Sequence, residues 1–179
     1  EREALSGATA VLLTHEHEDH FDAARSAAAR AADPALTVHT HPALAAALGD
    51  GVTAVAAGDV FTAAGFTVRA VGGEHAEIVD GLPGCPNLGF LVEGVYHPGD
   101  SLFVPAEPVD TLLVPASGPW VKIGEAIGFV RAVAPARAFP IHDIHLSEIG
   151  LEYFDDWLED ARAGTRYARL LRGESVDLP

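Results

Sequence analysis

A dense group of histidines and acids begins at Thr14, where the 179-residue chain reads THEHEDH. The apolar run before it, ATAVLLT, predicts a buried strand that leads directly into the group. Side chains two positions apart in an extended chain point the same way, so His15 and His17 could bind one ion. A turn would direct Asp19 and His20 toward a neighbouring position. Imidazole and carboxylate groups suit zinc and similar first-row metals.

Further histidines follow predicted strands along the chain. His75 comes after a β-rich stretch, His97 ends a predicted hairpin, and His142 follows another predicted strand. In layered α/β folds, sites form where strands end and loops begin. We therefore expect these strand ends to lie at one edge of the fold, beside the first cluster.

The order His-x-His-x-Asp-His, starting at His15, resembles the signature of the metallo-β-lactamase superfamily. The family pattern continues with a His, an Asp and a final His, each after a later strand. This chain offers three matches: His75, Asp100 and His142. The resemblance covers nearly the whole chain, and it implies an αββα four-layer sandwich with a dinuclear metal site at one edge.

Carried over residue by residue, the resemblance implies two metal positions that share one carboxylate. The first metal would be held by His15, His17 and His75. The second would be held by Asp19, His20 and His142. Asp100 would bridge the two metals, and Asp19 and Asp100 would be the catalytic carboxylates. Zinc is the expected cofactor, at two Zn²⁺ per chain, with Mn²⁺ or Fe²⁺ as alternatives.

Within the superfamily, the chain resembles small bacterial metal-dependent hydrolases similar to the L-ascorbate-6-phosphate lactonase group. The stretches PASGPW, from Pro115, and PIHD, from Pro140, carry this finer resemblance. It implies that a hydroxide shared by two metals attacks an ester, lactone, amide or phosphoester. Two alternatives on the same fold stay open: a mononuclear iron oxidoreductase similar to persulfide dioxygenases, and a non-catalytic scaffold.

Three further residues are candidates for contacts with the substrate: Lys122, Trp120 and His97. Lys122 could meet an anionic group or simply begin a helix in solvent. Trp120 could line the pocket wall or pack in the interior. His97 lies three residues before Asp100 and could reach the site or serve the structure alone.

Histidine ligands need acceptors that fix their tautomers, and Glu16, Glu18 and Asp143 are the candidates near the motifs. His39 and His41 also have the spacing of a metal motif. They lack the Asp-His continuation, so we expect them to be ordinary surface or loop residues.

The composition limits the classes of partner that the chain can bind. The chain has 11 basic and 26 acidic residues, for a formal charge of −15, which disfavours nucleic acid and anionic lipid. Its apolar runs are too short to predict a membrane span. Cys85 is the only cysteine, so no internal disulfide can form and a cytoplasmic location is expected. A small-molecule substrate is expected, and homo-oligomer formation is left open.

The elements that position these residues predict one α/β domain over residues 1–179. Helices are expected over 23–32, 42–48, 123–134 and 148–163, with Asp22 and Ser147 as caps of the first and last. Leu151, Phe154, Trp157 and Leu158 are expected to share the apolar face of the last helix. A final strand pair is expected over 167–171 and 175–178. Only one predicted strand precedes the histidine cluster, whereas family members begin with several. The N-terminal strands are therefore expected to be missing from this chain.

Overall fold

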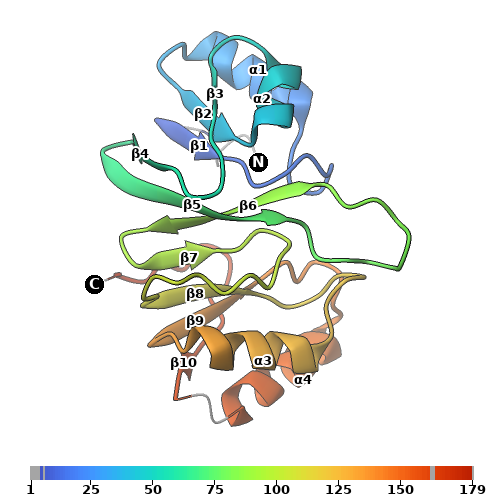
Figure 1. Ribbon diagram of the computed structural model, residues 1–179. Coiled ribbons are helices and arrows are strands. Elements are labelled where there is room, and N and C mark those ends of the chain that lie inside the picture. Colours follow the sequence, from blue (N-terminus) through green and yellow to red (C-terminus); the bar gives the residue numbers. More distant parts are fainter. Residues whose placement is uncertain (1–4, 6, 162–163, 179) are drawn as a thin grey trace.

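The computed structural model describes residues 5, 7–161 and 164–178 (Figure 1). The first sheet has three parallel strands in the order β1-β2-β3, with bounds Ala10–Leu12, Thr37–Thr40 and Val52–Ala54. Two crossover helices connect these strands, α1 (Ala23–Ala32) and α2 (Pro42–Leu48). The strand before the histidine cluster is shorter than the predicted run.

The second sheet has seven strands in the order β10-β9-β8-β7-β6-β5-β4. An antiparallel part contains β4 (Val60–Ala63), β5 (Phe66–Glu74), β6 (Pro86–Val92) and β7 (Val95–His97). A parallel part adds β8 (Thr111–Pro115), β9 (Arg137–Ile141) and β10 (Arg166–Tyr167). The helices α3 (Ile123–Val133) and α4 (Glu148–Asp160) belong to this half of the chain.

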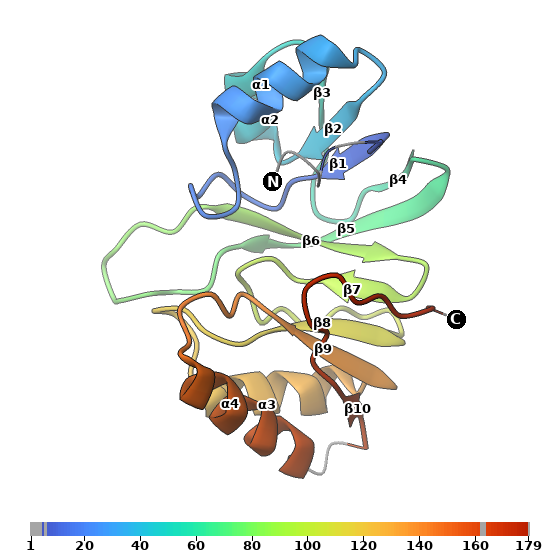
Figure 2. The ribbon, with the colours of Figure 1, turned by 180° about the vertical axis from the view of Figure 1, so that it is seen from behind.

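Two apolar cores show how the layers are ordered. Successive residues of a strand point to opposite faces of its sheet. Leu88 and Phe90 of β6 therefore pack toward Ala10 and Leu12 of the first sheet, while Leu91 belongs to a core shared with α3 and α4. Figures 1 and 2 show α1 and α2 at one end of the molecule and α3 and α4 at the other. The predicted αββα layering is confirmed.

The predicted helix caps are confirmed. The Asp22 carboxylate accepts a hydrogen bond from the backbone N–H of Arg25 at 2.9 Å, which satisfies a free donor in the first turn of α1. The Ser147 hydroxyl does the same for Gly150 in α4 at 3.2 Å.

Two predictions about the C-terminal part are wrong. The final strand pair reduces to Arg166–Tyr167, because the side chain of Arg169 then turns to Asp155 and Asp143 and the chain leaves the sheet. Trp157, expected on the buried face of α4, is 46% exposed. Its position is about 80° around the helix from the middle of the stripe that Phe154 and Leu158 bury. Residues 162 and 163, at the end of the predicted helix, lie outside the described residues.

Within the described residues, no helix has both the length and the apolar character that a membrane crossing requires.

Candidate metal centre

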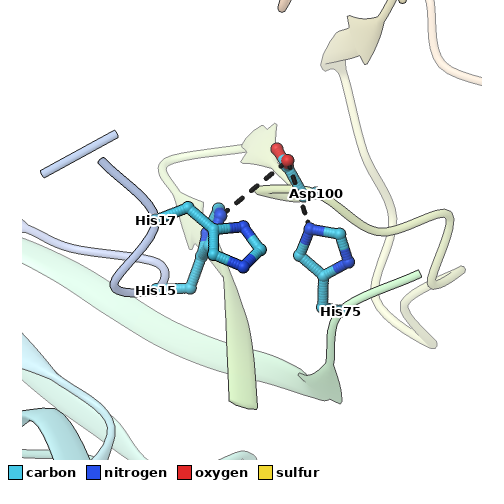
Figure 3. A group of neighbouring side chains, drawn as sticks. All are labelled: His15, His17, His75 and Asp100. Carbon is cyan, nitrogen blue, oxygen red and sulfur yellow. Dashed lines mark ion pairs between the residues drawn. The ribbon is translucent and has the colours of Figure 1, made fainter. Parts of the chain in front are cut away.

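The candidate metal ligands come from four strand ends that meet at one edge of the two sheets. The segment from His15 to His20 follows β1, His75 follows β5, Asp100 follows β7 and His142 follows β9. Figure 3 shows His15, His17, His75 and Asp100 gathered in one place, with Asp100 in contact with two of the histidines. The expectation that these strand ends share one edge is confirmed by this arrangement.

Their ligating atoms form two groups, each with all its atoms within 4.8 Å of one another. The first group contains His15, His17, His75 and Asp100. The second contains Asp19, His20 and His142. The two groups have the membership that the resemblance implies for two metal positions, with Asp100 placed in the first.

Asp100 lies between the two groups. One of its oxygens, Oδ1, is 3.2 Å from Nε2 of His20. The other, Oδ2, is 3.3 Å from Nε2 of His75 and 3.2 Å from Nε2 of His142. The Asp100 side chain is only 4% exposed. A buried carboxylate that reaches histidines of both groups can serve as a shared ligand.

Without a metal, the charges in this cluster depend strongly on one another. Burial alone would raise the pKa of Asp100, but close contacts with the rings of His142, His20 and His75 hold it far below the usual range. The same contact with Asp100 raises the pKa of His142 to about 9. Burial lowers the pKa of His15 to about 3, with a further contribution from His20. The cluster thus keeps Asp100 ionised and His15 neutral at neutral pH.

The donor set fits metal ions. Three buried ligating atoms have no hydrogen-bond partner: Nε2 of His15, Oδ1 of Asp100 and Nε2 of His142. A buried polar atom left unsatisfied costs about 1–3 kcal/mol. Neutral imidazole and carboxylate are the ligands that zinc and similar first-row metals prefer. Bound cations would satisfy all three atoms.

The other ring nitrogens of the histidines are held by the backbone and a hydroxyl. Nδ1 of His75 is 2.6 Å from the carbonyl oxygen of Ala76, and Nδ1 of His142 is 2.6 Å from that of Ser117. Nδ1 of His15 is 2.9 Å from Oγ1 of Thr14. When each Nδ1–H donates to its acceptor, Nε2 is left with a lone pair that faces the cluster.

The three acids expected in this role are placed elsewhere. Glu16 lies 2.9 Å from Nε2 of His41, Asp143 pairs with Arg169, and Glu18 is exposed. Sequence proximity favoured these acids, but the acceptors beside Nδ1 of His15, His75 and His142 belong to Thr14, Ala76 and Ser117. The prediction was therefore wrong about the acceptors.

His39 and His41 are buried, contrary to the expectation of surface or loop residues; they are 7% and 3% exposed. The His39 ring stacks on Phe61, with 4.8 Å between centroids. Nδ1 of His41 accepts the Leu44 N–H and so begins α2, while Nε2–H donates to Glu16. His41 thus ties the histidine-rich loop to the start of a helix.

Ser117 holds His142 in an unusual backbone conformation. His142 has φ of +55°, in the left-handed region that non-glycine residues seldom adopt. Ser117 donates to the His142 carbonyl oxygen from its hydroxyl at 2.6 Å and from its backbone N–H at 3.1 Å. Together with the bond from the His142 ring, these contacts fix the ring toward Asp100.

Asn87 and Gly99 position Asp100. Asn87, 0% exposed, accepts the Asp100 N–H at 3.0 Å and donates to the Pro98 carbonyl at 2.9 Å. Gly99 has φ of +64°, and a Cβ there would lie 2.2 Å from Oδ1 of Asn87. Only glycine permits this close approach.

The three candidate substrate contacts differ in position. Trp120 is buried, and its ring meets those of His75 and His142 edge-on at 5.7 and 5.8 Å, so it forms a wall of the cluster. Nδ1 of His97 accepts the Gly99 N–H at 3.1 Å, and burial lowers its pKa to about 4. Lys122 is exposed at the start of α3, where its backbone N–H donates to Glu125 at 2.7 Å. The structure therefore brings Trp120 to the cluster and gives Lys122 a helix-capping contact.

Sequence reasoning missed the residues that orient the ligands. Ser117 lies in the PASGPW stretch, so the resemblance there was a usable signal. Asn87 gives no such signal, because its partner is 13 residues away. Thr14 could have been found from its place between the apolar strand and His15.

Comparisons with known proteins identify the family and the fold. Residues 2–142 match the family described as Beta-lactamase superfamily domain. Protein Rv0786c of Mycobacterium tuberculosis is 47% identical over 146 residues, which cover 78% of this chain and 69% of that protein.

Two solved structures share the fold. A candidate metal-dependent hydrolase of Parabacteroides distasonis superimposes with a TM-score of 0.68 at 22% identity, over 90% of this chain and 76% of that one. Igni18, a metallo hydrolase of Ignicoccus hospitalis, gives a TM-score of 0.68 at 20% identity, over 93% and 78%. The chain belongs to the metallo-β-lactamase superfamily.

Proposed function

We propose that this protein is a metal-dependent hydrolase that binds two metal ions and cleaves an ester, lactone, amide or phosphoester of a small molecule. The observation that carries the proposal is the convergence of histidines from both sheets on the buried Asp100. Membership of the superfamily and the hydrolase descriptions of the two similar structures support it.

In this proposal, His15, His17 and His75 hold one metal, and Asp19, His20 and His142 hold the other. Asp100 is the shared ligand. Zinc suits this mixture of imidazole and carboxylate best, and Mn²⁺ or Fe²⁺ would also be accepted. We also propose the grouping with L-ascorbate-6-phosphate lactonases and a cytoplasmic location, and we leave homo-oligomer formation open.

When bound, the two metals would lower the pKa of a shared water and polarise the substrate oxygen. The chain's own residues would do the rest. Asp100 stays ionised at its buried position, which keeps a negative charge between the two histidine groups. The Asp19 side chain is 49% exposed, so one of its carboxylate oxygens is available to accept the proton of the attacking water. The carbonyls of Ala76 and Ser117 retain the Nδ1 protons of His75 and His142.

The test is removal and return of the metal. Protein stripped with a chelator should be inactive toward a panel of esters, lactones and phosphodiesters, and activity should return as two equivalents of Zn²⁺ are added. Iron at one equivalent per chain, with oxidation of a persulfide and no hydrolysis, would instead support the iron oxidoreductase. A folded protein that binds no metal would support the scaffold.

A further inference from the structure

A pocket of about 840 Å³ opens beside the first group of candidate ligands. His17 and His75 line it, and most of the rest of the wall comes from the loop between β5 and β6. Figure 1 shows this loop projecting away from the body of the molecule. Because the pocket and the candidate centre share two histidines, a substrate whose reacting group lies at the centre can extend into this pocket.

The wall of the pocket offers apolar contacts. Ile78 and Leu82 line it while remaining 39% and 52% exposed, and Pro83 lies next to Leu82. Exposed apolar side chains inside a concave surface lose contact with water when an apolar ligand group covers them. This loop is therefore suited to an alkyl or aryl group.

The pocket wall carries acidic side chains. Glu74 and Glu77 line the pocket, and among its described lining residues none is a lysine or arginine. Two divalent ions would carry four positive charges against the two negative charges of Asp19 and Asp100, so anions would be attracted at the centre itself. Away from the centre, the two glutamates and the −15 charge of the chain oppose an anionic group.

We propose that this pocket receives an apolar arm of the substrate that bears no negative charge, next to the bond that is cleaved. This inference rests on the proposed hydrolase function and narrows its substrates to those with a neutral or cationic arm. Apolar contacts with Ile78 and Leu82 would bind the arm, and Glu74 and Glu77 would reject an anionic one.

Cys85 is a built-in reporter of this selectivity. It is the only cysteine of the chain, it lines the pocket, and its Sγ is 3.7 Å from Nε2 of His17. We would label the zinc-loaded protein with two methanethiosulfonates of similar size, one bearing a trimethylammonium group and one a sulfonate. The Cys85 thiolate attacks the sulfenyl sulfur, a disulfide forms and methanesulfinate leaves. Each rate is divided by that of free 2-mercaptoethanol with the same reagent.

The ratio of the normalised rates, cationic over anionic, should fall at least about fivefold in Glu74→Gln with Glu77→Gln, because both glutamates act on the reagent as it enters. The attraction of the zinc ions for the anionic reagent is the same in both proteins and cancels in this comparison. Glu93→Gln is the matched control and should leave the ratio unchanged, because it removes an exposed glutamate from the β6–β7 turn, at the far end of β6 from the pocket. The proposal is overturned if the double variant has the same ratio as the unaltered protein.

A second readout uses three p-nitrophenyl esters whose acyl chains end in trimethylammonium, methyl or carboxylate. The carboxylate ester should have the lowest kcat/KM, and the double variant should narrow the difference. Hydrolysis that favours the carboxylate ester would overturn the inference and leave the proposed function standing. No hydrolysis of any ester, together with the expected labelling ratio, would support the charge selectivity of the pocket and count against the proposed function.

Discussion

The two sheets contribute to the candidate metal centre in different ways. The three-stranded sheet delivers one continuous segment, His15 to His20, after a strand of three half-buried residues. The seven-stranded sheet delivers single residues from three separate strands: His75, Asp100 and His142. The segment from His15 to His20, the contiguous half of the centre, is easy to recognise in the sequence. The other three residues form the dispersed half, and they are recognised as ligands only once the fold is considered.

The supports of the two halves differ as well. The helix that follows the contiguous half, α1, has no buried residue among its ten. The loops of the dispersed half begin at strands that pass through the main core, where Tyr96 and Leu112 are 0% exposed. The half of the centre with the more deeply buried supports therefore has the weaker sequence signal. Asp100 matters most, because it belongs to this half and contacts histidines of both halves.

The largest effect is expected from Asp100→Ala. Loss of the shared carboxylate should remove at least one metal per chain and lower kcat/KM by about 10²–10³-fold or more, because a preorganised charge at the reacting centre is lost. Metal content by plasma mass spectrometry, with circular dichroism to verify folding, measures this. A variant that keeps both metals would refute the shared-ligand role.

Asn87→Ala and Thr37→Ala compare how much each half of the centre depends on one hydrogen-bonding side chain in its surroundings. Removal of the Asn87 amide leaves the Asp100 N–H and the Pro98 carbonyl without their buried partner, at a cost of about 2–4 kcal/mol in unfolding free energy. Thr37 of β2 is exposed; its hydroxyl donates to the Thr9 carbonyl and lies 3.3 Å from Nε2 of His39, so its loss should cost about 1 kcal/mol. Urea denaturation gives both unfolding free energies. Equal losses would contradict the difference in burial between the two supports.

The pH dependence of the stability of the metal-free protein tests the contact between His142 and Asp100 in the dispersed half. Asp100 raises the pKa of His142 from 6.5 to about 9. The charged ring therefore contributes stability that is fully present below pH 6.5 and is lost as the pH rises through 9. The melting temperature of chelated protein should fall over this range. Zinc-loaded protein should not show this fall, because a ligating imidazole is already neutral. A flat profile without metal would show that the pair contributes little.

His39→Ala should have the smallest effect on the centre. The His39 ring stacks on Phe61 and lies outside both ligand groups, so metal content should be unchanged. A modest loss of stability, about 1 kcal/mol, is expected from the lost packing. Loss of one metal equivalent would mean that the ligands are misassigned.

Much of the architecture could be predicted because its signals are local. The α1 and α4 caps need only a side chain and a backbone N–H three residues on. The gathering of His75, Asp100 and His142 could be predicted because strand ends in this fold share an edge. The acceptors of their rings could not, because Ser117 meets His142 across 25 residues through backbone atoms that every residue carries. The predicted strand over 167–171 was too long, because the observed strand ends at Tyr167. Beyond it, the Arg169 side chain pairs with Asp155, a contact that no strand pattern indicates.

The most direct test of a centre shared by the two sheets is a zinc titration of the metal-free protein, followed by calorimetry and checked by metal analysis. We predict saturation at two zinc ions per chain in the unaltered protein. Saturation of the folded protein at a single ion per chain would contradict it.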